Sequence, residues 1–222
     1  TLLKRTGPLP GAADWTKQSA DAGNTVYSQD TLVKAPLGLL WFGGSDNANV
    51  LPRHGHGPTP QVAGGRLFIL GVNTLTARDV YTGRTLWTAD LPGIGKAYDN
   101  TSHQPGANAL GSNYISLPDG IYIHQGSTCL RLDPATGKTV STFPLPVADG
   151  EQPNPPIGYI AAVDSYLIVT TEPIIVDTAR IGLFNANATV SKRIAVLDRH
   201  TGAVLWTRDA ALGFAHNAIA AG

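Results

Sequence analysis

A five-residue pattern, Asp-x-x-Thr-Gly, occurs three times in the 222 residues of this chain and constrains its fold more than any other feature. The copies are Asp79–Gly83, Asp133–Gly137 and Asp198–Gly202. The aspartate can accept hydrogen bonds from backbone N–H groups of the turn that follows, and the glycine can take a positive φ that lets the chain reverse. Because each copy follows an alternating apolar run, the pattern predicts the same turn between two strands in three successive repeats.

Four short strands are expected in every repeat, most of them separated by turn-forming residues. They are Thr59–Ala63, Arg66–Leu70, Thr74–Asp79 and Thr85–Ala89, then Asn113–Leu117, Ile121–His124, Thr128–Asp133 and Thr139–Phe143, then Tyr159–Val163, Tyr166–Thr171, Arg193–Asp198 and Ala203–Thr207. An insertion, Glu172–Lys192, lengthens the third repeat, so the aspartates stand 54 residues apart (79 to 133) and then 65 (133 to 198). Four strands at this period predict an all-β fold, a β-propeller of four-stranded antiparallel blades.

The repeats predict three full blades, at about residues 57–92, 111–146 and 157–209, within a propeller segment that spans 13–222. Residues 1–12 are expected to be a junction or linker, and the next blade is expected to begin at about residue 214. Trp41 is interpreted as the end of a blade that precedes the first full one. Propellers close with roughly four to eight blades, so this one is expected to be an incomplete part of a longer polypeptide. Its bare strand edges favour completion by remaining blades of the same polypeptide or by a protein partner.

Aromatic residues support this register. Trp87 and Trp206 each stand four residues after the turn glycine of their repeat. Because tryptophan buries a large apolar area, we interpret both as core wedges between neighbouring blades. The second repeat has Ser141 at this place, so its gap is expected to be filled by another residue, such as Phe143.

Composition narrows the classes of partner. The chain has 16 basic and 16 acidic residues and a formal net charge of zero, which argues against nucleic acid or an anionic membrane surface as a partner. Its apolar runs are too short to predict a membrane span. Cys129 is the only cysteine, so neither an internal disulfide nor a cysteine-based zinc cluster can form, and we interpret Cys129 as a small buried hydrophobe.

The first repeat, Gln61–Ile69 followed by Asp79-x-x-Thr-Gly-x-x-Leu-Trp87, resembles the repeats of pyrroloquinoline-quinone-like (quinoprotein-like) propellers. Asp14-Trp15, Asn24-Thr25 and Ser28 resemble the opening segment of such propellers. The resemblance covers nearly the whole chain and implies the fold. It does not imply a function, because the family includes quinone-dependent alcohol dehydrogenases, assembly scaffolds and uncharacterised bacterial proteins.

A narrower resemblance concerns the stretch from Leu9 to Gly57, which is similar to large bacterial proteins that join a methyltransferase-like domain to such a propeller. No glycine-rich nucleotide loop after a strand is present here, so no methyl-transfer site is placed in this chain. The family resemblance leans towards the periplasm or cell envelope, whereas a methyltransferase companion would favour the cytoplasm.

The candidate ligand face consists of polar residues in the loops that precede the first strand of each blade, because these loops converge near the axis of a propeller. These residues are His54, His56, Asp99, Asn100, His103, His216 and Asn217. His54 and His56 are the candidate metal ligands, since the two imidazoles of a His-x-His pair point to one side of a strand. The glycines beside them favour a loop, in which histidine serves as a hydrogen-bond donor and acceptor instead.

Two functions compete. The first is a non-catalytic propeller module for ligand or protein binding, with no catalytic residue and no cofactor assigned. The alternative is a fragment of a pyrroloquinoline-quinone-dependent oxidoreductase, for which the resemblance implies the quinone, calcium and commonly a pair of adjacent cysteines. Cys129 has no adjacent cysteine, which favours the first interpretation.

Overall fold

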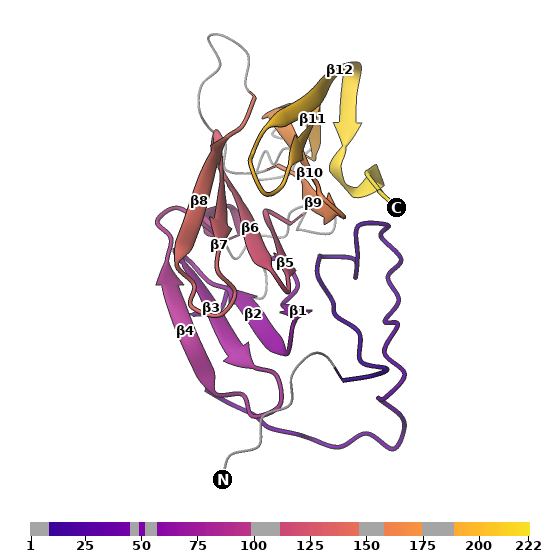
Figure 1. Cartoon of the computed structure of the whole chain (residues 1–222), viewed down its shortest axis with the longest axis vertical. Coiled ribbons are helices and arrows are strands. Elements are labelled where there is room, and N and C mark those ends of the chain that lie inside the picture. The colour runs from indigo at the N-terminus through magenta and orange to yellow at the C-terminus, as the bar shows by residue number, and fades with distance from the viewer. Residues whose placement is uncertain (1–8, 45–48, 52–56, 99–111, 147–157, 175–188) are drawn as a thin grey trace, which may run out of the picture.

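The computed structural model describes residues 9–44, 49–51, 57–98, 112–146, 158–174 and 189–222 (Figure 1). It is an all-β structure of three four-stranded antiparallel sheets, each with its strands in sequence order. The first sheet contains β1 (Gln61–Ala63), β2 (Arg66–Leu70), β3 (Thr74–Asp79) and β4 (Thr85–Asp90). The second contains β5 (Tyr114–Leu117), β6 (Gly120–Gln125), β7 (Thr128–Leu132) and β8 (Thr139–Pro144). The third contains β9 (Ile160–Val163), β10 (Tyr166–Pro173), β11 (Val190–Asp198) and β12 (Val204–Ala215).

The third sheet departs from the sequence expectation at two places. Glu172, Pro173 and residues 190–192 were expected in an insertion, but β10 and β11 continue into this stretch because Pro173 pairs with Ser191. The longer β11 also gives partners to the end of β12, where Phe214 pairs with Ser191. Residue 214, near which a further blade is expected to begin, therefore lies on the last strand of the third sheet.

The three predicted turns have one geometry. Asp198 accepts hydrogen bonds at Oδ1 from the backbone N–H of His200 (3.0 Å) and of Thr201 (2.8 Å), and from the Thr201 hydroxyl (2.9 Å). The backbone N–H and then the hydroxyl of Thr201 hold the pKa of Asp198 below its ordinary value. Asp79 accepts the same three bonds and Asp133 the two backbone bonds, and the closing glycines have φ of 69°, 72° and 76°. These turns therefore join the third and fourth strands of every sheet as the sequence predicts.

The core lies between successive sheets, which pack face to face as blades do (Figure 1). Phe68 and Leu75 of the first sheet belong to one buried cluster with Ile121 and Ile123 of the second. A second cluster joins the opposite face of the second sheet to one face of the third. Successive side chains on a strand point to opposite faces, so the middle sheet contributes to both clusters.

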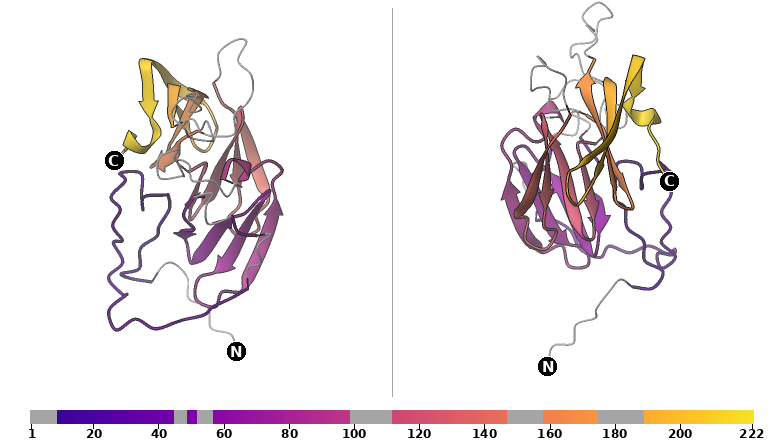
Figure 2. Two further views of the ribbon diagram at one scale, coloured as in Figure 1. Left: turned by 180° about the vertical axis from the view of Figure 1, so that it is seen from behind. Right: turned by 45° about the horizontal axis from the view of Figure 1, so that its top comes forward.

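The N-terminal segment runs beside the inner strands β1, β5 and β9 (Figure 1). Trp15 and Val62 of β1 exchange two backbone hydrogen bonds, and Ser116 of β5 donates to the carbonyl of Thr16. The C-terminal end lies next to the same segment in both views of Figure 2, where the N–H of Ala221 donates to the carbonyl of Ala22. The segment thus connects all three sheets. No helix in the described part of the chain is long and apolar enough to cross a membrane.

Candidate functional site

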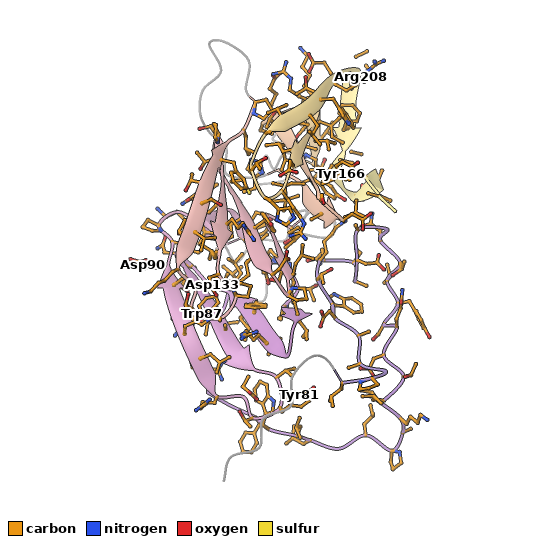
Figure 3. The ribbon with its side chains drawn as sticks, viewed as in Figure 1. Tyr81, Trp87, Asp90, Asp133, Tyr166 and Arg208 are labelled. Atoms are coloured by element: carbon orange, nitrogen blue, oxygen red, sulfur yellow. The ribbon has the colours of Figure 1, made fainter. Side chains whose placement is uncertain are left out.

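Aromatic rings lock each sheet to the turn of the next, and Trp87 shows the arrangement most fully. Its Nε1 donates a hydrogen bond to the carbonyl oxygen of Pro134 (3.0 Å), and a Cβ added at Gly137 would lie 2.5 Å from Trp87 Cε3. Figure 3 shows Trp87 of the first sheet beside Asp133, where this turn begins. The ring fits because the turn ends in a residue without a Cβ.

Two further rings occupy turns in the same way. The Nε1 of Trp41 donates to the carbonyl oxygen of Val80 (2.8 Å), and the indole packs on Gly83. Phe143 packs on Gly202, which confirms the prediction that it fills the place left by Ser141. Trp41 lies outside any assigned strand, yet its ring holds the position expected for the end of a preceding blade. We call Trp41, Trp87, Phe143 and Trp206 the wedge rings.

Trp206 is the exception, because half of it (51%) is exposed to solvent. On β12 it pairs with Val196 next to a bulge, as Trp87 on β4 pairs with Ala77 next to a bulge. Among the described residues, no turn glycine has Trp206 as a near neighbour, and its indole N–H donates no hydrogen bond. The expectation that Trp206 is a core wedge is therefore wrong for this chain as it stands, since no described sheet follows the third one.

Trp206 belongs to an exposed surface of the third sheet that we call the open face. Its exposed members, Tyr166, Trp206 and Arg208, lie on the side of the sheet opposite the second-sheet core, around Ile168 and Val196, which are buried. Tyr166 is 48% exposed, and Figure 3 shows Tyr166 and Arg208 on this sheet. Phe214, Ile219, Ala221 and Ala22 pack against the cluster that includes Ile168 and Val196, so apolar side chains cover only part of the face.

A second feature of the site is a buried lysine at the inner strands. Lys17 Nζ donates hydrogen bonds to Asn24 Oδ1 (2.6 Å) and to the Tyr159 hydroxyl (2.8 Å), and it lies 4.5 Å from the centroid of the Tyr159 ring. The Tyr159 hydroxyl in turn donates to the carbonyl of Ile219 (2.9 Å). Burial lowers the pKa of Lys17 to about 8, although the charge of Asp21 acts in the opposite direction. The N-terminal segment, β9 and the C-terminal end therefore meet at one polar cluster.

Replacing Tyr159 by phenylalanine should lower the free energy of unfolding by about 1–2 kcal/mol, because a buried ammonium and a backbone carbonyl each lose a hydrogen-bond partner. Urea denaturation of both proteins measures the difference. Tyr166→Phe is the matched control, since Tyr166 is half exposed and no hydrogen bond of its hydroxyl is formed in the described part of the chain. An equal effect of both substitutions would contradict this role of the Tyr159 hydroxyl.

The predicted ligand face is described at two of its seven residues, because His54, His56, Asp99, Asn100 and His103 lie outside the described residues. Both lie in η4 (His216–Ala218), a short 3-10 helix that follows β12, where Asn217 is exposed and His216 is fully buried. His216 Nε2 lies 2.7 Å from Ser191 Oγ and 3.4 Å from Thr170 Oγ1. In this position its imidazole is a hydrogen-bond partner of buried hydroxyl groups, and a ligand role for the loops remains a prediction.

Sequence reasoning missed His124, which ends up near His216 at the boundary between the second and third sheets. Its Nε2 donates to the carbonyl of Gly126 (3.0 Å), while Gly158 packs so closely on the imidazole that a Cβ there would collide with it. Burial lowers the pKa of His124 to about 4, and the nearby His216 adds to this effect. The only sequence signal is a histidine in an otherwise apolar strand, Ile121–His124, which does not reveal its neighbours.

A metal or quinone site needs donor groups such as thiolate, carboxylate and imidazole side chains. Cys129 is fully buried, as predicted, and burial raises the pKa of its thiol to about 12, so the thiol stays protonated. Within the described ranges, no three His, Cys, Asp or Glu side chains come close enough together to hold a metal ion. These residues do not fit a calcium–quinone site, and no redox step is assigned to them.

No protein-family model matches this chain, and no curated protein matches it. Solved structures do. A quinohemoprotein alcohol dehydrogenase from Comamonas testosteroni has a TM-score of 0.55 at 19% identity, over 88% of this chain and 27% of that protein. A europium-containing methanol dehydrogenase has a TM-score of 0.55 at 17% identity, over 89% of this chain and 32% of that protein.

A quinohemoprotein alcohol dehydrogenase from Pseudomonas putida HK5 is similar to the same degree, with a TM-score of 0.53 at 17% identity over 90% of this chain and 27% of that protein. This chain therefore spans less than a third of the length of each of the three structures. At such low identity the likeness concerns the fold alone. Together with the three four-stranded sheets and their repeated turns, it shows that the chain has the fold of a quinoprotein-like β-propeller, with three blades that do not close a ring among the described residues.

Proposed function

We propose that this chain is a non-catalytic propeller module that binds protein through the open face of its third sheet. The observation that carries the proposal is the half-exposed Trp206, which stands in the register that Trp87 occupies on the first sheet. Three of the four wedge rings are covered by a turn of the following sheet, and Trp206 is not. Tryptophan and tyrosine are enriched at protein interfaces and often dominate their binding energy.

A second exposed apolar surface, on the N-terminal segment, supports the protein-binding part of the proposal. Its large apolar side chains are strongly exposed, and they are Val26, Tyr27, Val33, Leu37, Leu39, Leu40 and Phe42. Phe42 and Leu39 are 85% and 78% exposed, although Trp41 between them is held against the first sheet. Contiguous exposed apolar side chains on a soluble protein mark interaction surfaces more often than isolated ones do. Both ends of the stack of sheets thus offer apolar surface to a partner.

A photoreactive phenylalanine analogue at position 206 tests the proposal in the cell that makes the protein. Irradiation should produce a covalent adduct of one discrete mass. The matched control places the same analogue at Val140, which is 55% exposed on the fourth strand of the second sheet and should give no adduct. Equal adducts at both positions, or none at position 206, would contradict binding at the open face.

The non-catalytic part of the proposal is tested separately. The protein is titrated with pyrroloquinoline quinone, with and without calcium, while the absorbance of the quinone and the Tm of the protein are followed. We expect no saturable complex, because the described residues provide neither a metal-binding group nor a reactive thiol. A saturable, calcium-dependent complex would overturn this part and support the oxidoreductase interpretation.

A further inference from the structure

The third strands of the three sheets differ at one position, the residue before the turn aspartate. The second and third sheets have Leu132 and Leu197 there, and both leucines are fully buried in the core that their sheet shares with the preceding one. The first sheet has Arg78, which is only 3% exposed. A charged side chain is therefore buried where the other two repeats have an apolar one, and such burial is costly unless a counter-charge accompanies it.

The Arg78 side chain points to the face of the first sheet opposite the second sheet, which we call the outer face. Leu75 and Ala77 point the other way, into the core shared with the second sheet. Thr76 lies on the outer face with Arg78, and its hydroxyl oxygen lies 3.2 Å from that of Thr88. At the same two positions β7 and β11 have only apolar side chains. The outer face is thus polar where its counterparts are not.

The guanidinium of Arg78 is bound by neutral acceptors. Its Nη1 donates to the carbonyl oxygen of Gly83 (2.9 Å) and, at a longer distance, to that of Gly43 (3.3 Å), and its Nη2 donates to that of Gly44. Its Nε is buried and donates no hydrogen bond in the described part of the chain. No carboxylate of the described residues forms an ion pair with Arg78. Carbonyl oxygens satisfy N–H groups but carry no net charge, so the positive charge has no counter-ion among these residues.

Two exposed glycines, Gly43 and Gly44, contact the guanidinium through their backbone. Their φ values are 85° and 88°. A Cβ at Gly44 would lie 2.6 Å from Arg78 Nη1, so the close approach of this backbone requires glycine. Because these residues have no side chains, a small displacement of their carbonyl groups opens the guanidinium to a ligand from solvent.

We infer that Arg78 binds an oxyanion, a carboxylate or a phosphate, whose oxygens replace the carbonyl oxygens of Gly43 and Gly44. The guanidinium is planar, and its N–H groups match two oxygens of such a group. A hydrogen bond between charged partners is roughly twice as strong as one between neutral groups, which favours the exchange. Gly83 keeps its bond to Nη1 and holds the side chain in place. This site lies on a different sheet from the open face and does not depend on the proposed function.

Titration of the full chain with sodium phosphate, and separately with N-acetylaspartate amide, tests the inference at constant ionic strength. The NMR signal of the Arg78 Nε–H, assigned with Arg78→Leu, should move in a saturable way. Calorimetry should show that Arg78→Leu weakens binding at least about tenfold, because the charge-assisted bonds are lost. Tighter binding of phosphate would identify the ligand as a free phosphate, and tighter binding of the aspartate derivative would identify it as a carboxylate side chain.

Arg84→Leu is the matched control, since it removes the same charge from an exposed position of the first sheet and should leave binding unchanged. Arg78→Leu should fold, because the other two repeats have leucine at this position. Should it not fold, Arg78→Lys replaces it, since lysine keeps the charge but cannot pair with two oxygens in one plane. Equal weakening by the substitutions at positions 78 and 84 would overturn the inference, and so would a signal of the Arg78 Nε–H that saturates with neither anion.

Gly44→Ala tests the exchange of acceptors. The added Cβ has no room beside Arg78 Nη1, so the carbonyl of residue 44 should leave the guanidinium and stop competing with the oxyanion. We expect binding at least about fivefold tighter than in Gly43→Ala. Gly43→Ala is the matched control, because φ is similar there and an added Cβ would meet nothing within 4 Å. Equal affinity of the two variants would show that the Gly44 carbonyl does not stand in the place of the anion, and would overturn the inference.

Discussion

Gly137→Ala should lower the free energy of unfolding by about 2–4 kcal/mol, a large effect for the addition of one methyl group. Two costs combine. The φ of Gly137 is 72°, a conformation that costs an L-residue roughly 1–2 kcal/mol. In addition, the new Cβ would lie 2.5 Å from Trp87 Cε3, so the indole or the turn has to move in a packed boundary between two sheets. Urea denaturation of the two proteins measures the difference.

Gly65→Ala is the matched control for the backbone cost. Gly65 has a similar φ of 76°, but an added Cβ would meet nothing within 4 Å. We therefore expect this control to cost about 1–2 kcal/mol, which is the conformational part alone. Equal losses for the two substitutions would show that the ring imposes no steric requirement on the turn.

A double-mutant cycle isolates the contact between ring and turn. In a Trp87→Ala background the obstacle at Gly137 is gone, so Gly137→Ala should cost no more than the control substitution. The difference between the two backgrounds is the coupling energy, expected at about 1–3 kcal/mol. A coupling energy of zero would contradict the packing of Trp87 on the turn that ends at Gly137.

The fold could be predicted from the sequence because its determinants are local and repeated. Aspartate, threonine and glycine at fixed spacing specify the turn between third and fourth strands, and alternation specifies the strands on either side. Most predicted strand ends agree with the structure within two residues. The role of Phe143 as the packing ring of the second sheet was predictable for the same reason. Ser141 stands where the first sheet has Trp87, and it leaves a gap that a nearby aromatic residue can fill.

The polar cluster at the inner strands could not be predicted, because its members are far apart in the sequence. Lys17 and Tyr159 are separated by 142 positions, and no spacing rule connects a lysine in a loop with a tyrosine at the start of a blade. The extension of β11 and β12 was missed for a related reason. The start of β11 and the end of β12 form a strand pair only with each other, as Ser191 does with Phe214. Neither stretch is therefore recognisable as a strand from its own sequence.

Trp206 shows that the repeat pattern predicts the register of a residue but not its burial. The sequence places Trp206 and Trp87 in equivalent positions, and the structure gives them equivalent registers. Their burial differs because burial depends on the neighbouring sheet, which a repeat specifies only if it is present. A tryptophan at this position therefore predicts a ring that packs on a neighbouring turn. The structure shows that Trp206 has no such neighbour among the described residues and is half exposed.

Protonation of His124 should lower the free energy of unfolding as the pH falls below about 6.5, before most carboxylates are protonated. Its pKa is about 4 in the folded protein, whereas an unfolded histidine titrates near 6.5. The unfolded state therefore binds the extra proton first as the pH falls. The contribution to stability is complete above about pH 6.5 and is lost progressively towards pH 4, with a total of about 3 kcal/mol.

Urea denaturation at several pH values between 7 and 4 measures this loss, and His124→Gln should reduce the slope because glutamine does not titrate yet can donate to the carbonyl of Gly126. The unsubstituted protein is the reference, and since no carboxylate is changed by His124→Gln, the difference in slope between the two proteins belongs to His124. The same slope in the His124→Gln protein as in the unsubstituted one would mean that a proton enters the boundary between the second and third sheets without cost, which is incompatible with an imidazole packed against Gly158.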